Sequence, residues 1–146
     1  MGIQDANTAG NVHGGTIMKM VDEVAGVAAV RHCGTRVVTA ALDRMTFTQP
    51  VYVGQLVTVK ATVNAAWRSS MEVGVRVESE DVRSGEITHT STAYLTMVAL
   101  DEEGQPTGVA AIEPDTEDER RREREAQLRR DNRLRERDEI RRSRGE

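Results

Sequence analysis

The hydrophobic and polar positions of this chain follow two different patterns. From residue 17 to residue 30 apolar side chains recur at nearly every position, interrupted by the charges of Lys19, Asp22 and Glu23. Apolar side chains therefore cover almost the whole circumference of a helix, which is typical of a buried helix. We predict a helix over residues 15–33 that is buried on all sides and that ends at Gly34, a residue suited to the left-handed conformation.

After residue 34 apolar and polar residues alternate, a period of two residues that is typical of β-strands. Apolar and polar residues alternate through Leu56–Ala65 and again through Met71–Glu78. Further strands are predicted over Arg36–Asp43 and Thr88–Leu100, and residues 83–86 are typical of a hairpin turn. Short connections imply antiparallel neighbours. The pattern therefore predicts an α+β fold, in which one long helix packs on a curved antiparallel sheet of four or five strands.

The last 34 residues differ in composition from the rest of the chain. Residues 113–146 contain 12 arginines, 12 acidic residues and four apolar residues, whereas residues 1–112 contain 51 apolar residues. Asp or Glu precedes Arg by four residues at five places, which favours a helix by about 0.2–0.5 kcal/mol per pair. We therefore divide the chain into a folded domain, 1–112, and a charged tail, 113–146, expected to be a helix that frays toward Glu146. A fully solvated tail is the alternative.

Charge and composition argue against several classes of protein. The formal net charge of -4 does not favour nonspecific binding of nucleic acid. Neither a run of about 18 apolar residues nor a secretory leader pattern is present, so we expect no membrane association. Cys33 is the only cysteine and the three histidines are scattered, so neither an intrachain disulfide nor a metal site is predicted. These features together favour a cytoplasmic protein.

A short segment leading into the predicted helix contains the strongest candidate chemistry. Residues 11–16 include Asn11, Gly14 and Gly15, and two glycines at a helix start let a ligand approach the backbone closely. The free N–H groups and the helix dipole there favour negative charge, as in the oxyanion of acyl transfer. Asp22 lies about two turns further along. A carboxylate on an apolar helix is costly unless paired, with Lys19 or an arginine, or functional.

Further motifs extend this pattern along the chain. They are residues 7–18, residues 21–26, residues 37–40, Phe47 followed by Pro50, Val51 and Gly54, residues 70–73, and an arginine-containing segment at 126–133. In this order and spacing, over about residues 5–133, the sequence resembles the hotdog-fold acyl-CoA thioesterases of the cytosolic acyl-CoA hydrolase type.

The resemblance implies a fold, an assembly and a reaction. It implies a hotdog fold whose dimers join two sheets edge to edge, often assembled further as trimers of dimers. It also implies hydrolysis of acyl-CoA to a free acid and CoA at a site between two protomers, with Asn11, Asp22 and Gly15 as the catalytic residues. Asp22 would activate water as a general base or attack directly, Asn11 would orient the water or the thioester, and the Gly15 N–H would polarise the carbonyl.

The resemblance also suggests positions that contact CoA. Arginine suits the CoA phosphates because its planar group donates two hydrogen bonds to an anion. CoA is part of the substrate and the product, so no separate cofactor is expected. The expected substrate- and CoA-binding residues are Gly14, Ala40, Ala41, Leu42, Ser69, Ser70, Met71, Arg68, Arg129 and Arg130.

Two features leave alternatives open. The resembling proteins usually carry a strand before the glycine loop, but only four residues precede Asp5, so that strand is either truncated or missing. The function could also be non-catalytic, as a hotdog module that binds acyl-CoA as a sensor or scaffold. Such a module would not need both Asn11 and Asp22. A hotdog dehydratase is less favoured because His13 lies in the wrong motif context.

Overall fold

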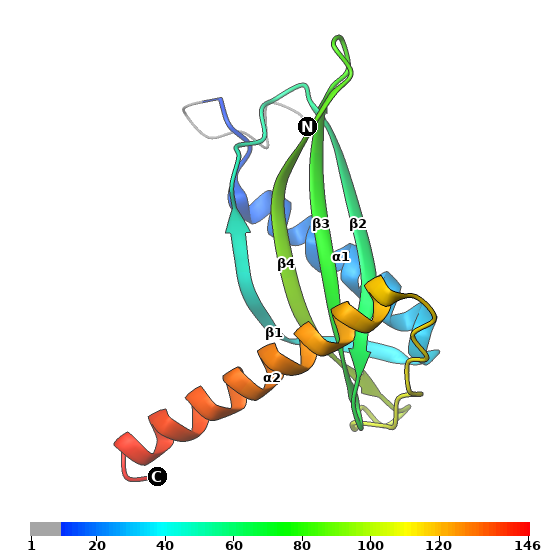
Figure 1. The fold of residues 1–146 in the computed structure, drawn as a ribbon, viewed down its shortest axis with the longest axis vertical. Helices are drawn as coiled ribbons and strands as arrows, with labels where there is room; N and C mark the ends of the chain where they lie inside the picture. Colours follow the sequence, from blue (N-terminus) through cyan, green and yellow to red (C-terminus); the bar gives the residue numbers. More distant parts are fainter. Residues whose placement is uncertain (1–9) are drawn as a thin grey trace.

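The computed structural model of the chain describes residues 10–146, and the question whether an N-terminal strand is truncated or missing falls outside them. The described elements follow the order α1 (Gly14–Cys33), β1 (Arg36–Phe47), β2 (Leu56–Ala66), β3 (Ser70–Asp81), β4 (Glu86–Leu100) and α2 (Glu117–Ser143). The four strands form one antiparallel sheet in the order β1-β4-β3-β2. The sheet curves around α1, as Figure 1 shows. The predicted arrangement of one long helix on a curved antiparallel sheet is thus confirmed.

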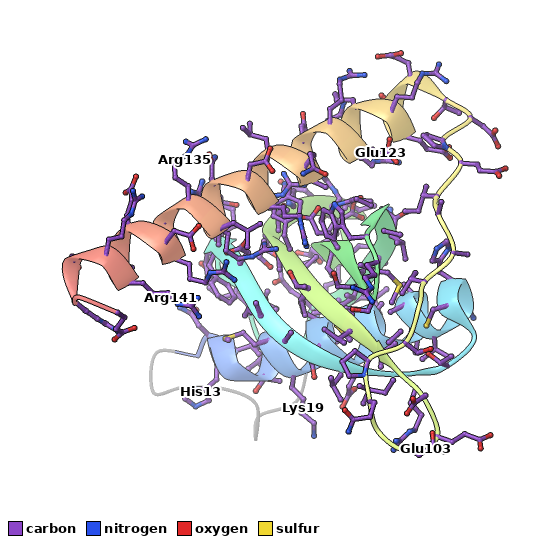
Figure 2. All side chains as sticks on the ribbon, turned by 90° about the horizontal axis from the view of Figure 1, so that it is seen from below. His13, Lys19, Glu103, Glu123, Arg135 and Arg141 are labelled. Carbon is purple, nitrogen blue, oxygen red and sulfur yellow. The ribbon has the colours of Figure 1, made fainter. Side chains whose placement is uncertain are left out.

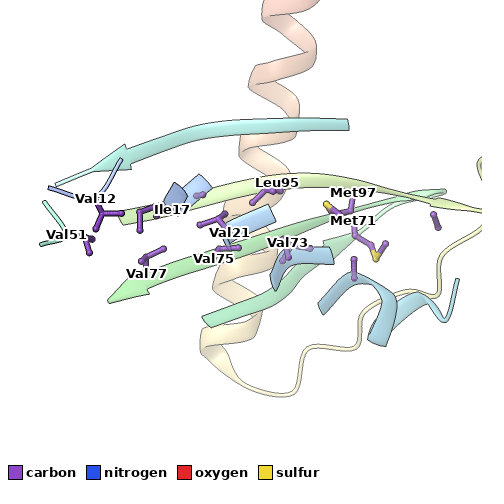
Figure 3. Packing of buried hydrophobic residues seen from close by; sticks show 14 residues of the cluster. Val12, Ile17, Val21, Val51, Met71, Val73, Val75, Val77, Leu95 and Met97 are labelled. Atoms are coloured by element: carbon purple, nitrogen blue, oxygen red, sulfur yellow. The ribbon is translucent and has the colours of Figure 1, made fainter. Parts of the chain in front are cut away.

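The hydrophobic core lies between α1 and the inner face of the sheet. The buried residues of α1 recur every four positions, which aligns them along one face of the helix. Alternate residues of the central strands β3 and β4 face this side, and Figure 3 shows the two sets packed together. The principal contacts of the core are made by Ile17, Val21, Ala25, Ala29, Met71, Val73, Val75, Val77, Leu95 and Met97.

The prediction that α1 is buried on all sides is wrong for the single chain. Met18, Val27 and Val30 of α1 are not covered by the sheet, with exposed fractions of 41%, 52% and 42%. The physical reason is geometric, because one sheet covers only one face of a helix. Val38 and Phe47 on β1 are also exposed, each at 46%. Exposed apolar side chains of this size on α1 and β1 favour an interface with another molecule.

The ends of the elements follow the expected local chemistry, with one exception. Gly34 adopts φ 74° and its N–H donates to the Val30 carbonyl, so α1 ends where predicted. The turn between β3 and β4 falls at residues 82–85, where Asp81 accepts a hydrogen bond from the Arg83 amide. Strand β1, in contrast, runs four residues beyond the predicted end at Asp43. Its two register irregularities disrupt the alternation that marks a strand in sequence.

The charged tail forms a helix that crosses the outer face of the sheet. The Thr116 hydroxyl caps α2 by accepting from the Glu119 amide at 3.1 Å, and Glu119 accepts from the Asp115 amide at 2.7 Å. Figure 2 shows α1 and α2 on opposite sides of the sheet. Some expected pairs within the helix are replaced by contacts with the sheet. The Arg129 side chain, for example, pairs with Glu72 on β3 and not with Glu125.

Helix α2 makes contacts in turn with the strands that it crosses and then extends past the edge of the sheet. Arg129 reaches Glu72 on β3 and Tyr94 on β4, and Arg133 reaches Asp43 on β1 at 2.9 Å. Beyond that point the helix projects past β1, as Figures 1 and 2 show. All side chains from Arg135 onward are exposed. The first half of α2 is thus part of the folded body, and the second half overhangs it.

Candidate active site

The loop before α1 is held against the segment that follows β1. Asn11 forms an isolated β-bridge with Tyr52, and the Val12 amide donates to the Val51 carbonyl at 2.7 Å. A groove of about 330 Å³ opens between these segments. The groove is lined by Asn11, Val12, Gly14, Ile17, Phe47, Thr48, Gln49, Pro50 and Val51. The expected site residues Asn11 and Gly14 therefore share one groove.

The N-terminus of α1 is suited to negative charge. The side chain of the N-cap residue His13 makes no capping hydrogen bond, and the first turn contains no acidic residue. The His13 carbonyl accepts from the amides of Thr16 and Ile17, whereas the amides of Gly14 and Gly15 precede this first turn. Apart from its two neighbours and the adjacent helix backbone, no atom of the described residues lies within 4 Å of the place where a Gly15 side chain would begin. An anion can therefore approach this end of the helix.

Asp22 lies on the exposed side of α1 and is held by a hydroxyl group. The Thr39 Oγ1 donates a short hydrogen bond to Asp22 Oδ1. Within residues 10–146, the carboxylate pairs with this hydroxyl and with neither Lys19 nor an arginine, so the expected salt-bridge alternative is wrong there. Thr39 also contacts the Met97 sulfur at 3.5 Å, and it sits where the register of β1 shifts. This hydrogen bond orients the Asp22 carboxylate.

Sequence reasoning did not identify Thr39 as a site residue. It lies in a run of β-branched residues whose pattern indicates only a strand. Its contact with Asp22 depends on how β1 passes α1, which no local pattern specifies. The nearest signal in the sequence is its place in the 37–40 motif that supports the family resemblance.

A single protomer does not bring Asn11 and Asp22 together. Asp22 lies eight residues after Gly14, or about 12 Å along the helix at about 1.5 Å per residue. Asn11 precedes Gly14 at the far end of this span. The expectation that the site combines residues of two protomers is compatible with this separation and stays a prediction.

The expected CoA-binding positions fall into two groups. Ala40, Ala41 and Leu42 lie on β1, which pairs with β4 on one side and has no partner strand on its other side among residues 10–146. Ser69 and Ser70 lie where the chain turns into β3. Met71 does not line a surface groove, because alternate residues of β3 face opposite sides and its side chain is fully buried in the core (Figure 3).

The two expected tail arginines have different surroundings. The Arg129 Nε and Nη2 donate to the two carboxylate oxygens of Glu72 at 2.8 and 2.7 Å, and its guanidinium lies 3.6 Å from the Tyr94 ring centre. Burial works to lower the pKa of Arg129, but the hydrogen bond and charge of Glu72 outweigh it, so this pKa is raised. The Arg130 guanidinium lies 4.5 Å over Trp67. Arg68 is exposed on the turn before β3.

The described residues contain neither a cluster of metal-binding side chains nor a membrane-spanning helix. Among residues 10–146, no group of three or more His, Cys, Asp and Glu side chains is arranged to hold a metal ion. Neither helix in the same range combines the length and the apolar character needed to cross a bilayer.

Comparison with known proteins identifies the family. A profile described as "Thioesterase superfamily" matches residues 9–86, more than half of the chain. The chain belongs to the thioesterase superfamily. Protein VdlD of Helicobacter pylori is 44% identical over 117 residues, which cover 80% of this chain and 67% of VdlD. The cytosolic acyl coenzyme A thioester hydrolase of Rattus norvegicus is 38% identical over 124 residues, which cover 84% of this chain and 32% of that protein.

Solved structures show that the thioesterase-superfamily fold extends to α2. A hexameric acyl-CoA thioesterase in its apo form has a TM-score of 0.90 and 38% identity, covering 93% of this chain and 87% of its own. The Staphylococcus aureus acyl-CoA hydrolase, solved with butyryl coenzyme A, coenzyme A and coenzyme A disulfide, has a TM-score of 0.89 and 35% identity, covering 98% and 87%. Variants of that hydrolase carry alanine for an asparagine at its position 28, an aspartate at its position 43 and a threonine at its position 60.

Proposed function

We propose that this chain hydrolyses acyl-CoA thioesters to a carboxylic acid and CoA. The hydrogen bond from Thr39 to Asp22, in a chain of the thioesterase superfamily, carries this proposal. In the S. aureus hydrolase the substituted threonine follows the substituted aspartate by 17 positions, from 43 to 60. Thr39 follows Asp22 by the same 17 positions. The shared spacing supports Asp22 as the catalytic carboxylate and adds Thr39 as the group that fixes one of its oxygens.

The spacing of the substituted residues in the S. aureus hydrolase also helps to choose between Asn7 and Asn11 as the site asparagine. In the S. aureus hydrolase the substituted asparagine precedes the substituted aspartate by 15 positions, from 28 to 43. Asn7 precedes Asp22 by 15 positions, whereas Asn11 precedes it by 11. The spacing therefore favours Asn7, which lies outside the described residues, and the groove beside α1 supports Asn11. We place Asn7 first and keep Asn11 as the second candidate.

The proposed reaction uses the N-terminus of α1 and a carboxylate from the partner protomer. The thioester carbonyl lies at the Gly15 amide, which stabilises the oxyanion that forms when water attacks the carbonyl carbon. Asp22 of the partner subunit takes the proton of the water, the carbon–sulfur bond breaks, and the CoA thiolate leaves and is protonated. Direct attack by the carboxylate, followed by hydrolysis of the resulting anhydride, is the alternative route. Neither route requires a metal or a cofactor.

We infer an assembly from the surfaces of the single chain. The edge of β1, which has no partner strand among residues 10–146, and the exposed apolar side chains of α1 support a dimer in which two sheets join edge to edge. Two of the similar thioesterases are described as hexameric, which supports a trimer of dimers. The CoA groove would then include Gly14, Ala40, Ala41, Leu42, Ser69 and Ser70, with Arg68 and Arg130 toward the phosphates. The cytosolic hydrolase relative and the single cysteine support a cytoplasmic location.

Release of free thiol from acyl-CoA tests the proposed function. Asp22→Asn should lower kcat by at least about 100-fold, since it removes the base while it keeps the shape of the side chain. CoA binding, measured by calorimetry, should persist in this variant. Asn7→Ala and Asn11→Ala, compared in the same assay, should separate the two asparagines, with the larger loss at Asn7. An Asp22→Asn variant with wild-type turnover would contradict the mechanism. Binding of acyl-CoA by the wild-type chain without hydrolysis would indicate the sensor or scaffold instead.

A further inference from the structure

We propose that the buried ion pair of Glu72 and Arg129 positions α2 so that Arg130 faces the phosphates of CoA. This inference rests on the proposed function and adds a positioning pair to it. Neither Glu72 nor Arg129 contacts the acyl group in this arrangement. Their effect on the substrate passes through the placement of the helix.

The ion pair of Glu72 and Arg129, which we call the clamp, is held by two hydrogen bonds. Glu72 is 2% exposed, and each of its carboxylate oxygens accepts one N–H of Arg129, at 2.8 and 2.7 Å. Such a two-point contact fixes the orientation of a guanidinium group as well as its position. The guanidinium is covered on one face by the Tyr94 ring of β4, 3.6 Å away. One residue of α2 is therefore tied to both central strands of the sheet.

The sheet is shaped to support this carboxylate. The register of β2 shifts between Val63 and Ala65, which places the Asn64 side chain beside Glu72. The Asn64 Nδ2 donates to Glu72 Oε2 at 3.0 Å, and Asn64 is 5% exposed. The amide group lies over Gly74, where a Cβ atom would approach Nδ2 to 2.6 Å. A bulge, a buried amide and a glycine thus combine to hold one glutamate under α2.

The position of Arg130 follows from this clamp. Arg130 is the next residue of α2, about 100° further around the helix. Its guanidinium lies 4.5 Å over the Trp67 ring, and Trp67 Nε1 donates to Gln127 on the same helix at 2.9 Å. Among residues 10–146, Arg130 pairs with no carboxylate. Its N–H groups are therefore available to an anion beside Trp67, whose backbone amide donates to the Ser70 carbonyl at 2.8 Å.

A role in stability alone does not explain the clamp well. Replacing a buried ion pair by apolar residues of similar volume is often neutral or stabilising, so burial of Glu72 and Arg129 is weak evidence for a role in stability. Ser70 and Glu72 are two residues apart on β3 and so face the same side of the sheet. The clamp therefore lies next to the segment proposed for CoA. A shift of α2 would move Arg130 relative to that segment.

Glu72→Gln tests the proposal, because it keeps the shape but replaces one acceptor by a donor. Whichever way the amide turns, at least one N–H of Arg129 loses its acceptor. We expect CoA to bind about tenfold more weakly, and KM for acyl-CoA to rise by a similar factor with kcat nearly unchanged. KM for the corresponding N-acetylcysteamine thioester, which has no nucleotide, should not change. Arg129→Lys should act in the same direction, since lysine lacks the planar fork.

A double-mutant cycle distinguishes an effect on the position of Arg130 from a general loss of structure. In an Arg130→Gln background, Glu72→Gln should cause little further loss of CoA affinity, because both changes remove the same contact. Glu117→Gln is the matched control, since Glu117 forms an exposed ion pair with Arg124 on the same helix, and it should leave CoA binding unchanged.

Three results would overturn the inference: wild-type CoA affinity in Glu72→Gln, additive losses in the cycle, or equal losses with both thioesters. Binding of CoA without hydrolysis by the wild-type chain would overturn only the proposed reaction. Failure of the wild-type chain to bind CoA would overturn both.

Discussion

At the scale of single residues, the two adjacent glycines at the start of α1 have different surroundings. A Cβ at Gly14 would lie 3.5 Å from the Phe47 ring, in ordinary contact. A Cβ at Gly15 would meet no atom of the described residues within 4 Å, and Gly15 is not among the glycines with positive φ. Neither packing within the protomer nor backbone conformation therefore requires glycine at position 15. In the proposed mechanism, access of the thioester to its amide favours glycine at this position.

Gly15→Ala should therefore separate stability from activity. The free energy of unfolding should stay the same or rise, by at most about 1 kcal/mol, because alanine favours a helix over glycine. The value of kcat/KM for acyl-CoA should fall by at least about tenfold, because the new methyl group blocks the approach to the oxyanion donor. Chemical denaturation and the thiol-release assay measure the two effects. An alanine variant with full activity would show that this amide does not face the thioester.

At the scale of the elements, the pair of strands β2 and β3 carries a charge cluster on the outer face of the sheet. The Glu78 carboxylate accepts from Arg76 Nε at 2.9 Å and lies 3.3 Å from Lys60 Nζ, across the strand pair. The hydrogen bond from Arg76, followed by that from Lys60, lowers the pKa of Glu78 below its usual value of 4.5. The two positive charges thus favour the ionised carboxylate in the folded state.

The lowered pKa predicts a difference in stability that depends on pH. Because the folded pKa lies below the unfolded value, the ionised Glu78 contributes stability that is fully present above about pH 4.5. This contribution is lost as the pH falls through the folded pKa. Glu78→Gln should therefore lower the unfolding midpoint at pH 7 and have a diminishing effect below pH 4. Parallel denaturation series at several pH values measure this, and an equal difference at all pH values would refute it.

The elements also show what local sequence pattern can and cannot predict. The apolar run of α1 and the alternation of β2 and β3 predicted these elements to within a few residues. The burial of Glu72 was not predictable from alternation, because a polar residue at an outward position of a strand normally faces solvent. Glu72 is buried only because α2 lies over it. Thr39 and the exposed face of α1 escaped prediction for the same reason, since both depend on contacts between distant segments.

At the scale of the whole molecule, the proposed active site is incomplete in one protomer. The loop residues lie at the N-terminus of α1, and Asp22 lies about two turns away on the exposed face of the same helix. Met18 and Val30 lie four residues before and eight residues after Asp22, on the same side of α1, and both are large apolar side chains that are exposed in the single chain, which favours an interface there. A partner helix placed on this face would bring its own Asp22 toward the loop. Assembly and catalysis would then depend on one interface.

Mixing two inactive variants tests this dependence directly. In a dimer of an Asp22→Asn chain with a chain that lacks the essential asparagine, one of the two sites keeps both wild-type residues and the other has neither. The two variants are unfolded, mixed in equal amounts and refolded together. Half of the dimers then contain one chain of each variant, and one of the two sites in each such dimer is intact. About a quarter of wild-type activity should therefore return. Each variant refolded alone is the control. If each site were built within one chain, every site in the mixture would carry one defect, and activity would not recover.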